Sequence, residues 1–123
     1  MVQIHVFEYQ FKNGEMIATG GEKVFHPPLE LPEWKYSEDS RVFVVYVYNE
    51  GEEKSDVVVE ADFSPCIIKG WKIYHMEKVK ISEGGMINDR RAVFSIKGLG
   101  GKEKQRIDIL VKGPPGKVKV ELR

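Results

Sequence analysis

Two alternating runs within residues 106–123, RIDILVKGPPGKVKVELR, decide the fold class of this chain. In each run an apolar side chain occupies every second position, which is typical of a β-strand with one buried and one solvent-facing side. The segment GPPG at residues 113–116 predicts a turn, because proline and glycine interrupt a regular ladder. We therefore expect a β-hairpin. The alternating apolar residues are Ile107, Ile109 and Val111 in the first run and Val118, Val120 and Leu122 in the second.

Residues 41–49, RVFVVYVYN, predict a different kind of strand. Apolar or aromatic side chains occupy both parities, so we expect this strand at the centre of a sheet with a covering layer on each side. The polar stretch 49–53, NEGEE, follows, and residues 56–64 then alternate again around Val57 and Val59. A short polar loop between two strands predicts a second antiparallel pair.

The N-terminal 40 residues combine one clear signal with one irregular stretch. Asn13-Gly14 lies between two apolar runs and predicts a tight hairpin. Residues 25–40 hold three prolines, which exclude a regular helix or a central strand, so we expect an irregular segment that packs on the body. Trp34 and Tyr36 belong to this segment.

The remaining runs complete an all-β pattern. Residues 91–97 and 77–82 alternate, and Gly84-Gly85 is expected to end the second of these strands. The total of about seven to nine short strands, with turn signals about every 8–12 residues, predicts an immunoglobulin-like antiparallel β-sandwich. We expect residues 1–123 to form a single domain.

The charge balance argues against some functions. Lys plus Arg and Asp plus Glu are both 19, so the net charge is zero and we expect no general nucleic-acid binding. No apolar run approaches the roughly 20 residues of a membrane helix, so no membrane span is expected. The N-terminus lacks signal-peptide features, which leaves a cytoplasmic protein or one whose signal was removed. Abundant Lys and Glu with few Gln and Asn indicate a thermophilic, archaeal origin.

A family resemblance covers about residues 40–123. Residues 45–51, VYVYNEG, followed by 55–59, SDVVV, are similar to the V-x-N-x-G and strand signature of CARDB-like domains, which are immunoglobulin-like modules related to cell-adhesion domains. Residues 94–101, FSIKGLGG, resemble that family's step into its last strands, and Gly116 precedes the final one. The first 40 residues depart from the pattern. The resemblance implies a non-catalytic binding or spacer module.

No arrangement of residues predicts a cofactor, a metal or an active site. The candidate metal ligands are His5, His26, His75 and Cys66. Cys66 and His75 lie nine positions apart, and Met76 follows His75 directly, which departs from the spacing of a cupredoxin. The chain lacks a Gly-x-Ser-x-Gly turn, and its glycine-rich residues 98–102 lack P-loop spacing. We therefore expect a protein that is not an enzyme.

Aromatic residues are the best binding candidates in the sequence. Tyr and Trp are frequent in binding hot spots, but they also pack in cores with a polar neighbour for each hydroxyl or indole N–H. We expect a protein-interaction or adhesion-type module that binds a partner or a second copy through a sheet face or edge. A carbohydrate-binding module that uses the same aromatics is the alternative, followed by a small metal or redox protein. The hypothetical binding residues are Tyr46, Tyr48, Trp34 and Trp71.

Overall fold

The computed structural model describes residues 1–19, 34–74, 81–114, 116 and 118–123, and these residues form strands, turns and loops without a helix. The predicted all-β antiparallel sandwich is confirmed, with nine strands in the described part of the chain. The strands are β1 (Val2–Lys12), β2 (Glu15–Thr19), β3 (Ser40–Asn49), β4 (Ser55–Asp62), β5 (Ile67–Ile73), β6 (Ile81–Met86), β7 (Arg91–Leu99), β8 (Lys104–Lys112) and β9 (Lys119–Leu122).

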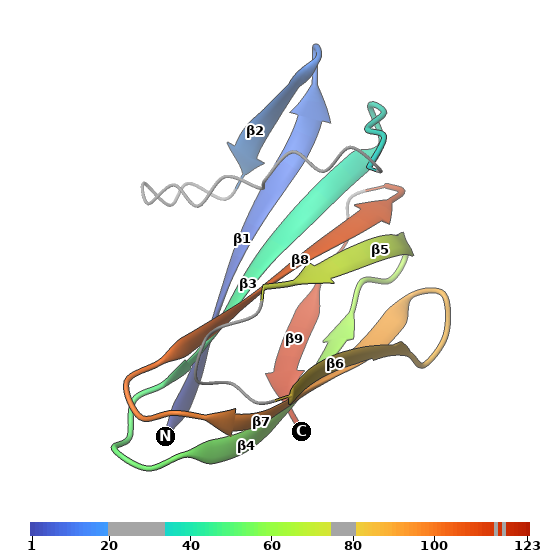
Figure 1. Ribbon diagram of the computed structural model, residues 1–123. Coiled ribbons are helices and arrows are strands. Elements are labelled where there is room, and N and C mark those ends of the chain that lie inside the picture. The colour runs from blue at the N-terminus through green and yellow to red at the C-terminus, as the bar shows by residue number, and fades with distance from the viewer. Residues whose placement is uncertain (20–33, 75–80, 115, 117) are drawn as a thin grey trace.

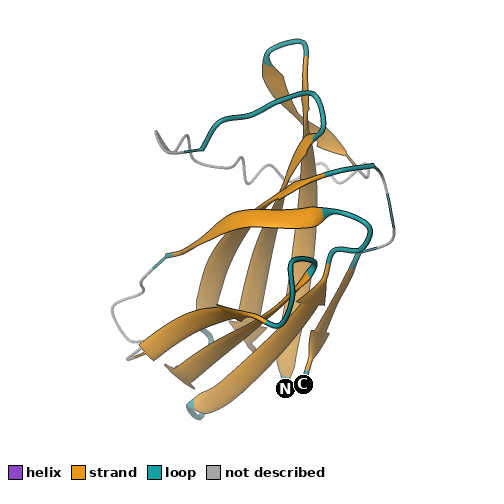
Figure 2. Ribbon diagram, turned by 90° about the vertical axis from the view of Figure 1, so that its right-hand side faces the viewer, coloured by secondary structure: helices purple, strands orange, loops and turns teal. Residues whose placement is uncertain are grey.

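Two antiparallel sheets form the two layers of the sandwich (Figures 1 and 2). The larger sheet has five strands in the order β2-β1-β3-β8-β5, and the smaller has four in the order β6-β7-β4-β9. The β1–β2 hairpin extends beyond the end of the four-stranded sheet (Figure 1). Asn13 and Gly14 have φ values of 51° and 78°, which is the left-handed backbone that a tight hairpin turn requires, so this predicted hairpin is confirmed.

The main core lies between the two sheets. Alternate residues of β3, β4, β7 and β8 point inward and are almost completely buried, and the rings of Phe43 and Phe63 pack at 5.1 Å. Each fully buried side chain of this size contributes roughly 1.5–3 kcal/mol. The inward residues of β3 are Phe43, Val45 and Val47, and those of β8 are Ile107, Ile109 and Val111.

A second, smaller core lies on the other side of β3. Val42 and Val44 are both 0% exposed, and they pack with Tyr9 and Leu110. Trp34 and Tyr36 pack against this face. The strand at residues 40–49 is therefore central, as its two apolar faces predicted, and it is covered on both sides from Val42 to Val45.

The two hairpins expected from residues 41–64 and 106–123 are wrong. β3 and β4 lie in different sheets, and so do β8 and β9. Alternation marks the buried face of a strand, but strands on either side of a sandwich core share that pattern, so it does not identify the partner strand. The loops cross between layers instead. The first crossing is held by Asn49, whose Nδ2 donates to the carbonyls of Glu53 at 2.8 Å and Leu99 at 3.0 Å.

The expected end of the strand near Gly84-Gly85 is also wrong, because β6 runs through both glycines. Gly84 is needed there for packing: a Cβ atom would lie 2.6 Å from Nε1 of Trp71 and 2.9 Å from Cδ1 of Phe94. Residues 77–80 of the expected strand lie outside the described residues, as do residues 25–33 of the expected irregular segment.

Candidate functional site

The strongest candidate surface is the outer face of the five-stranded sheet, which is the face turned away from the four-stranded sheet. Cross-strand register places Tyr46 opposite Arg106 and Tyr48 opposite Lys104 on this face. The Nζ atom of Lys104 lies 5.2 Å from the centre of the Tyr46 ring, and the guanidinium carbon of Arg106 lies 5.9 Å from it. These four residues, Tyr46, Tyr48, Lys104 and Arg106, are called the basic tyrosine patch below.

A buried ion pair fixes one end of this patch. Asp108 is 0% exposed, and it accepts hydrogen bonds from Nε and Nη2 of Arg106 at 2.8 and 2.9 Å. The two parallel bonds hold the guanidinium plane in one orientation. The hydroxyl of Tyr74 donates a third bond to Asp108 at 3.0 Å, and the Tyr74 ring lies 4.9 Å from the guanidinium carbon.

Burial and contact with Asp108 together shift the pKa values of Tyr74 and Arg106. Burial raises the pKa of Tyr74 to about 12, and the charge and hydrogen bond of Asp108 add to the shift. Burial alone would lower the pKa of Arg106, but the hydrogen bonds and charge of Asp108 outweigh it and raise that pKa. Arg106 therefore stays charged and Tyr74 stays neutral at physiological pH.

The outer face has a covered half and a partly exposed half. Trp34 and Tyr36 pack over the half that contains the second core, and Trp34 lies close enough to β5 that a Cβ on Gly70 would be 3.4 Å from its Nε1. Tyr46 also packs against this core, but Tyr46 and Tyr48 are partly exposed and form the other half, and Phe7 packs edge-on against Tyr46 at 6.1 Å. The partly exposed half therefore presents a tyrosine surface bordered by two cations.

The four hypothetical binding residues do not form one surface. Tyr46 and Tyr48 lie together, and Trp34 covers the other half of the same face. Trp71 packs instead against the core between the sheets, perpendicular to Phe94 at 5.7 Å. The sequence analysis did not single out Arg106 and Lys104 as binding residues. The alternation of β8 could have indicated them, because Lys104 and Arg106 lie at alternate positions before Leu110 and share its outward face.

The candidate metal ligands are not brought together in the described residues. His5 is exposed and lies 3.3 Å from the Gln3 side chain, whereas Cys66 is buried and its Sγ donates to the carbonyl of Pro114 at 3.1 Å. Burial raises the pKa of the Cys66 thiol. His26 and His75 lie outside the described residues. Within the described part, no group of three or more His, Cys, Asp or Glu residues could hold a metal ion.

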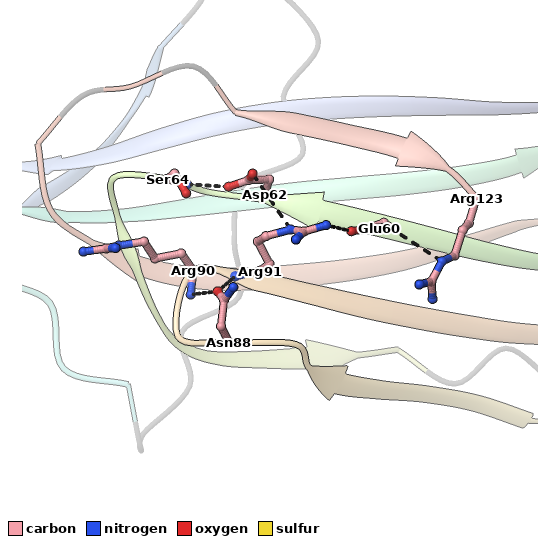
Figure 3. Close-up of polar contacts among 7 residues, drawn as sticks. All are labelled: Glu60, Asp62, Ser64, Asn88, Arg90, Arg91 and Arg123. Atoms are coloured by element: carbon pink, nitrogen blue, oxygen red, sulfur yellow. Dashed lines mark hydrogen bonds and ion pairs between the residues drawn. The ribbon is translucent and has the colours of Figure 1, made fainter.

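A hollow of about 350 Å³ lies on the outer face of the four-stranded sheet. Figure 3 shows that some of its charges bind one another: Glu60 accepts a hydrogen bond from Arg91 and lies 3.7 Å from Nε of Arg123. Hydrogen bonds from Ser64 lower the pKa of Asp62, and the charge of Arg91 assists. Three acidic and three basic side chains line the hollow, so it offers no net charge to a ligand. The lining residues are Glu60, Asp62, Glu121, Arg91, Lys119, Arg123 and Leu122.

Comparison with known proteins adds no further assignment. The chain matches no family model, no curated protein and no solved structure. The described residues contain no helix that is long and apolar enough to cross a membrane.

Proposed function

We propose that this chain is a non-catalytic binding module that contacts an acidic segment of a protein partner through the basic tyrosine patch. The observation that carries the proposal is the partly exposed pair Tyr46 and Tyr48 bordered by Lys104 and Arg106. Tyrosine and arginine are the residue types that supply most of the free energy at protein interfaces. The resemblance to CARDB-like domains supports the same role.

The fixed orientation of Arg106 strengthens this proposal. A guanidinium that already makes two bonds to Asp108 loses little side-chain entropy when a partner binds. Lys104 is exposed and can move toward a carboxylate on the partner. Asp108 compensates the charge of Arg106, so the charge of Lys104 at the rim of the tyrosine surface is what favours an acidic partner over a basic one.

A carbohydrate ligand is less well supported. Sugars stack on open aromatic ring faces, but Tyr46 is contacted by Phe7 and by two cations. Trp71 faces the core, and Trp34 packs on the sheet. Tyr48 alone does not form the extended platform that the alternative needs.

A capture experiment with matched variants tests the proposal. Tyr48→Ala combined with Lys104→Glu should weaken binding of the partner by about 2 kcal/mol, or roughly 30-fold in Kd, because it removes an aromatic contact and reverses a rim charge. Proteins captured from the source cells by the immobilised wild-type chain are identified, and the affinity of each purified candidate is then measured by calorimetry.

The control is Lys97→Glu, which makes the same charge change at an exposed position on β7. A specific partner is retained by the control and lost by the patch variant. Equal binding to both variants, or a change in Trp fluorescence with a polysaccharide and with no protein, contradicts the proposal.

A further inference from the structure

The last strand, β9, is an edge strand of the four-stranded sheet. It pairs with β4, and no other described strand pairs with it. The amide of Arg123 donates to the carbonyl of Val58 at 2.8 Å. Because the bonding groups of an antiparallel strand alternate in direction, Lys119 and Glu121 also bond toward β4, and the N–H and C=O groups of Val120 and Leu122 point to the other edge. Among the described residues, nothing bonds to that edge.

The charged side chains of β9 are not satisfied by ion pairs within the described part of the chain. Glu121 lies opposite Glu60 in the register with β4, and the carboxylate of Glu60 is already bound by Arg91 and Arg123. Like charges in opposite positions repel each other. Lys119 lies opposite Asp62 and helps to lower its pKa, yet neither Lys119 nor Glu121 forms an ion pair with a described residue.

We propose that two copies of this chain join through their β9 edges as an antiparallel pair about a two-fold axis at Val120. In this register Lys119 of each copy lies opposite Glu121 of the other, and Val120 lies opposite its own counterpart. The two four-stranded sheets then form one continuous eight-stranded sheet. Leu122, which is 45% exposed in one copy, is covered by Val118 of the second.

Charge complementarity selects this register over its neighbours. Antiparallel pairing aligns residues of the same parity, so the two-fold axis can pass through only one residue at a time. An axis at Lys119 places lysine opposite lysine, and an axis at Glu121 places glutamate opposite glutamate. An axis at Leu122 pairs fewer residues. Lysines on an edge strand normally prevent pairing, but the alternation of Lys119 and Glu121 makes this edge complementary to itself.

Charge reversal with rescue tests the proposal. Sedimentation velocity of the wild-type chain, from micromolar to millimolar concentration, should show a monomer–dimer equilibrium. Lys119→Glu and Glu121→Lys should each raise the dissociation constant roughly tenfold or more, because each places like charges opposite each other at two symmetric positions. An equimolar mixture of the two variants should form heterodimers, and the double variant should dimerise like the wild type.

Two control variants separate this effect from net charge. Lys97→Glu on β7 and Glu83→Lys on β6 make the same charge changes at exposed positions away from β9, and association should stay unchanged. Circular dichroism checks that each variant is folded. The proposal is overturned if the wild type stays monomeric, if the single variants dimerise like the wild type, or if their mixture stays monomeric. The β9 edge is distinct from the basic tyrosine patch, so either proposal can fail while the other stands.

Discussion

At the scale of single residues, the buried pair of Arg106 and Asp108 matters most. Asp108 is 0% exposed and lies on β8 among the buried aliphatic residues Ile107, Ile109, Leu110 and Val111. Its charge is tolerated because three hydrogen bonds compensate the lost hydration. The pair therefore ties Tyr74, which follows β5, to β8 and fixes the border of the basic tyrosine patch.

The stability of the folded protein should depend on the negative charge of Asp108. Asp108→Asn leaves the guanidinium of Arg106 without its counter-charge, so we expect a loss of about 3–5 kcal/mol in the free energy of unfolding. Urea denaturation monitored by Trp fluorescence measures the loss. Asp89→Asn, at an exposed turn position, is the control and should change stability by less than about 0.5 kcal/mol. Similar losses of stability in both variants would contradict the stabilising role assigned to the pair of Arg106 and Asp108.

The neutral state of Tyr74 should appear in the pH dependence of stability. Its pKa rises from about 10 in an unfolded chain to about 12 in the folded protein. The stability that this shift contributes is therefore complete below pH 10 and is lost as the pH rises toward 12, because the unfolded chain releases the proton first. Denaturation midpoints between pH 8 and pH 12 should fall less steeply for Tyr74→Phe than for the wild type. Parallel slopes would contradict the assignment.

At the scale of elements, local alternation predicted most of the strands, though not β5, and it did not predict their partners. The inward faces of β8 and β9 followed from apolar residues at every second position, and the two faces of β3 followed from an unbroken apolar run. The pairing was not predictable, because β3–β4 and β8–β9 are joined by loops that cross between sheets. The same limit applies to the site. Tyr46 and Tyr48 could be predicted from one strand, whereas Arg106 joins them only through the register of β3 with β8.

The contact between β5 and β6 gives a prediction with a neighbouring control. Gly84→Ala places a Cβ 2.6 Å from Nε1 of Trp71 and 2.9 Å from Cδ1 of Phe94, so we expect a loss of about 1–3 kcal/mol in the free energy of unfolding. Gly85→Ala, one residue along the same strand, meets nothing within 4 Å and should be close to neutral. Urea denaturation of both variants measures the difference. Equal effects of the two substitutions would contradict the packing assigned to Trp71.

At the scale of the whole molecule, the two sheets have different roles. The five-stranded sheet carries a core on each side of β3, and its outer face presents the basic tyrosine patch. The four-stranded sheet is covered on its inner side, and its outer side carries equal numbers of acidic and basic side chains around the hollow. A partner bound at the patch and a second copy joined at β9 would occupy different sheets. One dimer could then hold two partners at once.

The double burial of β3 also has a consequence for how this sequence can change over time. A strand with one wet face accepts substitutions at every second position, so β4 and β7 can diverge in that pattern. Between Val42 and Val45 every residue of β3 is at most 2% exposed, and each serves one of two cores. Substitution at either parity opens a cavity or buries a polar group. In distant descendants of this chain, β3 should therefore be the segment that drifts least, and the best guide for recognising them.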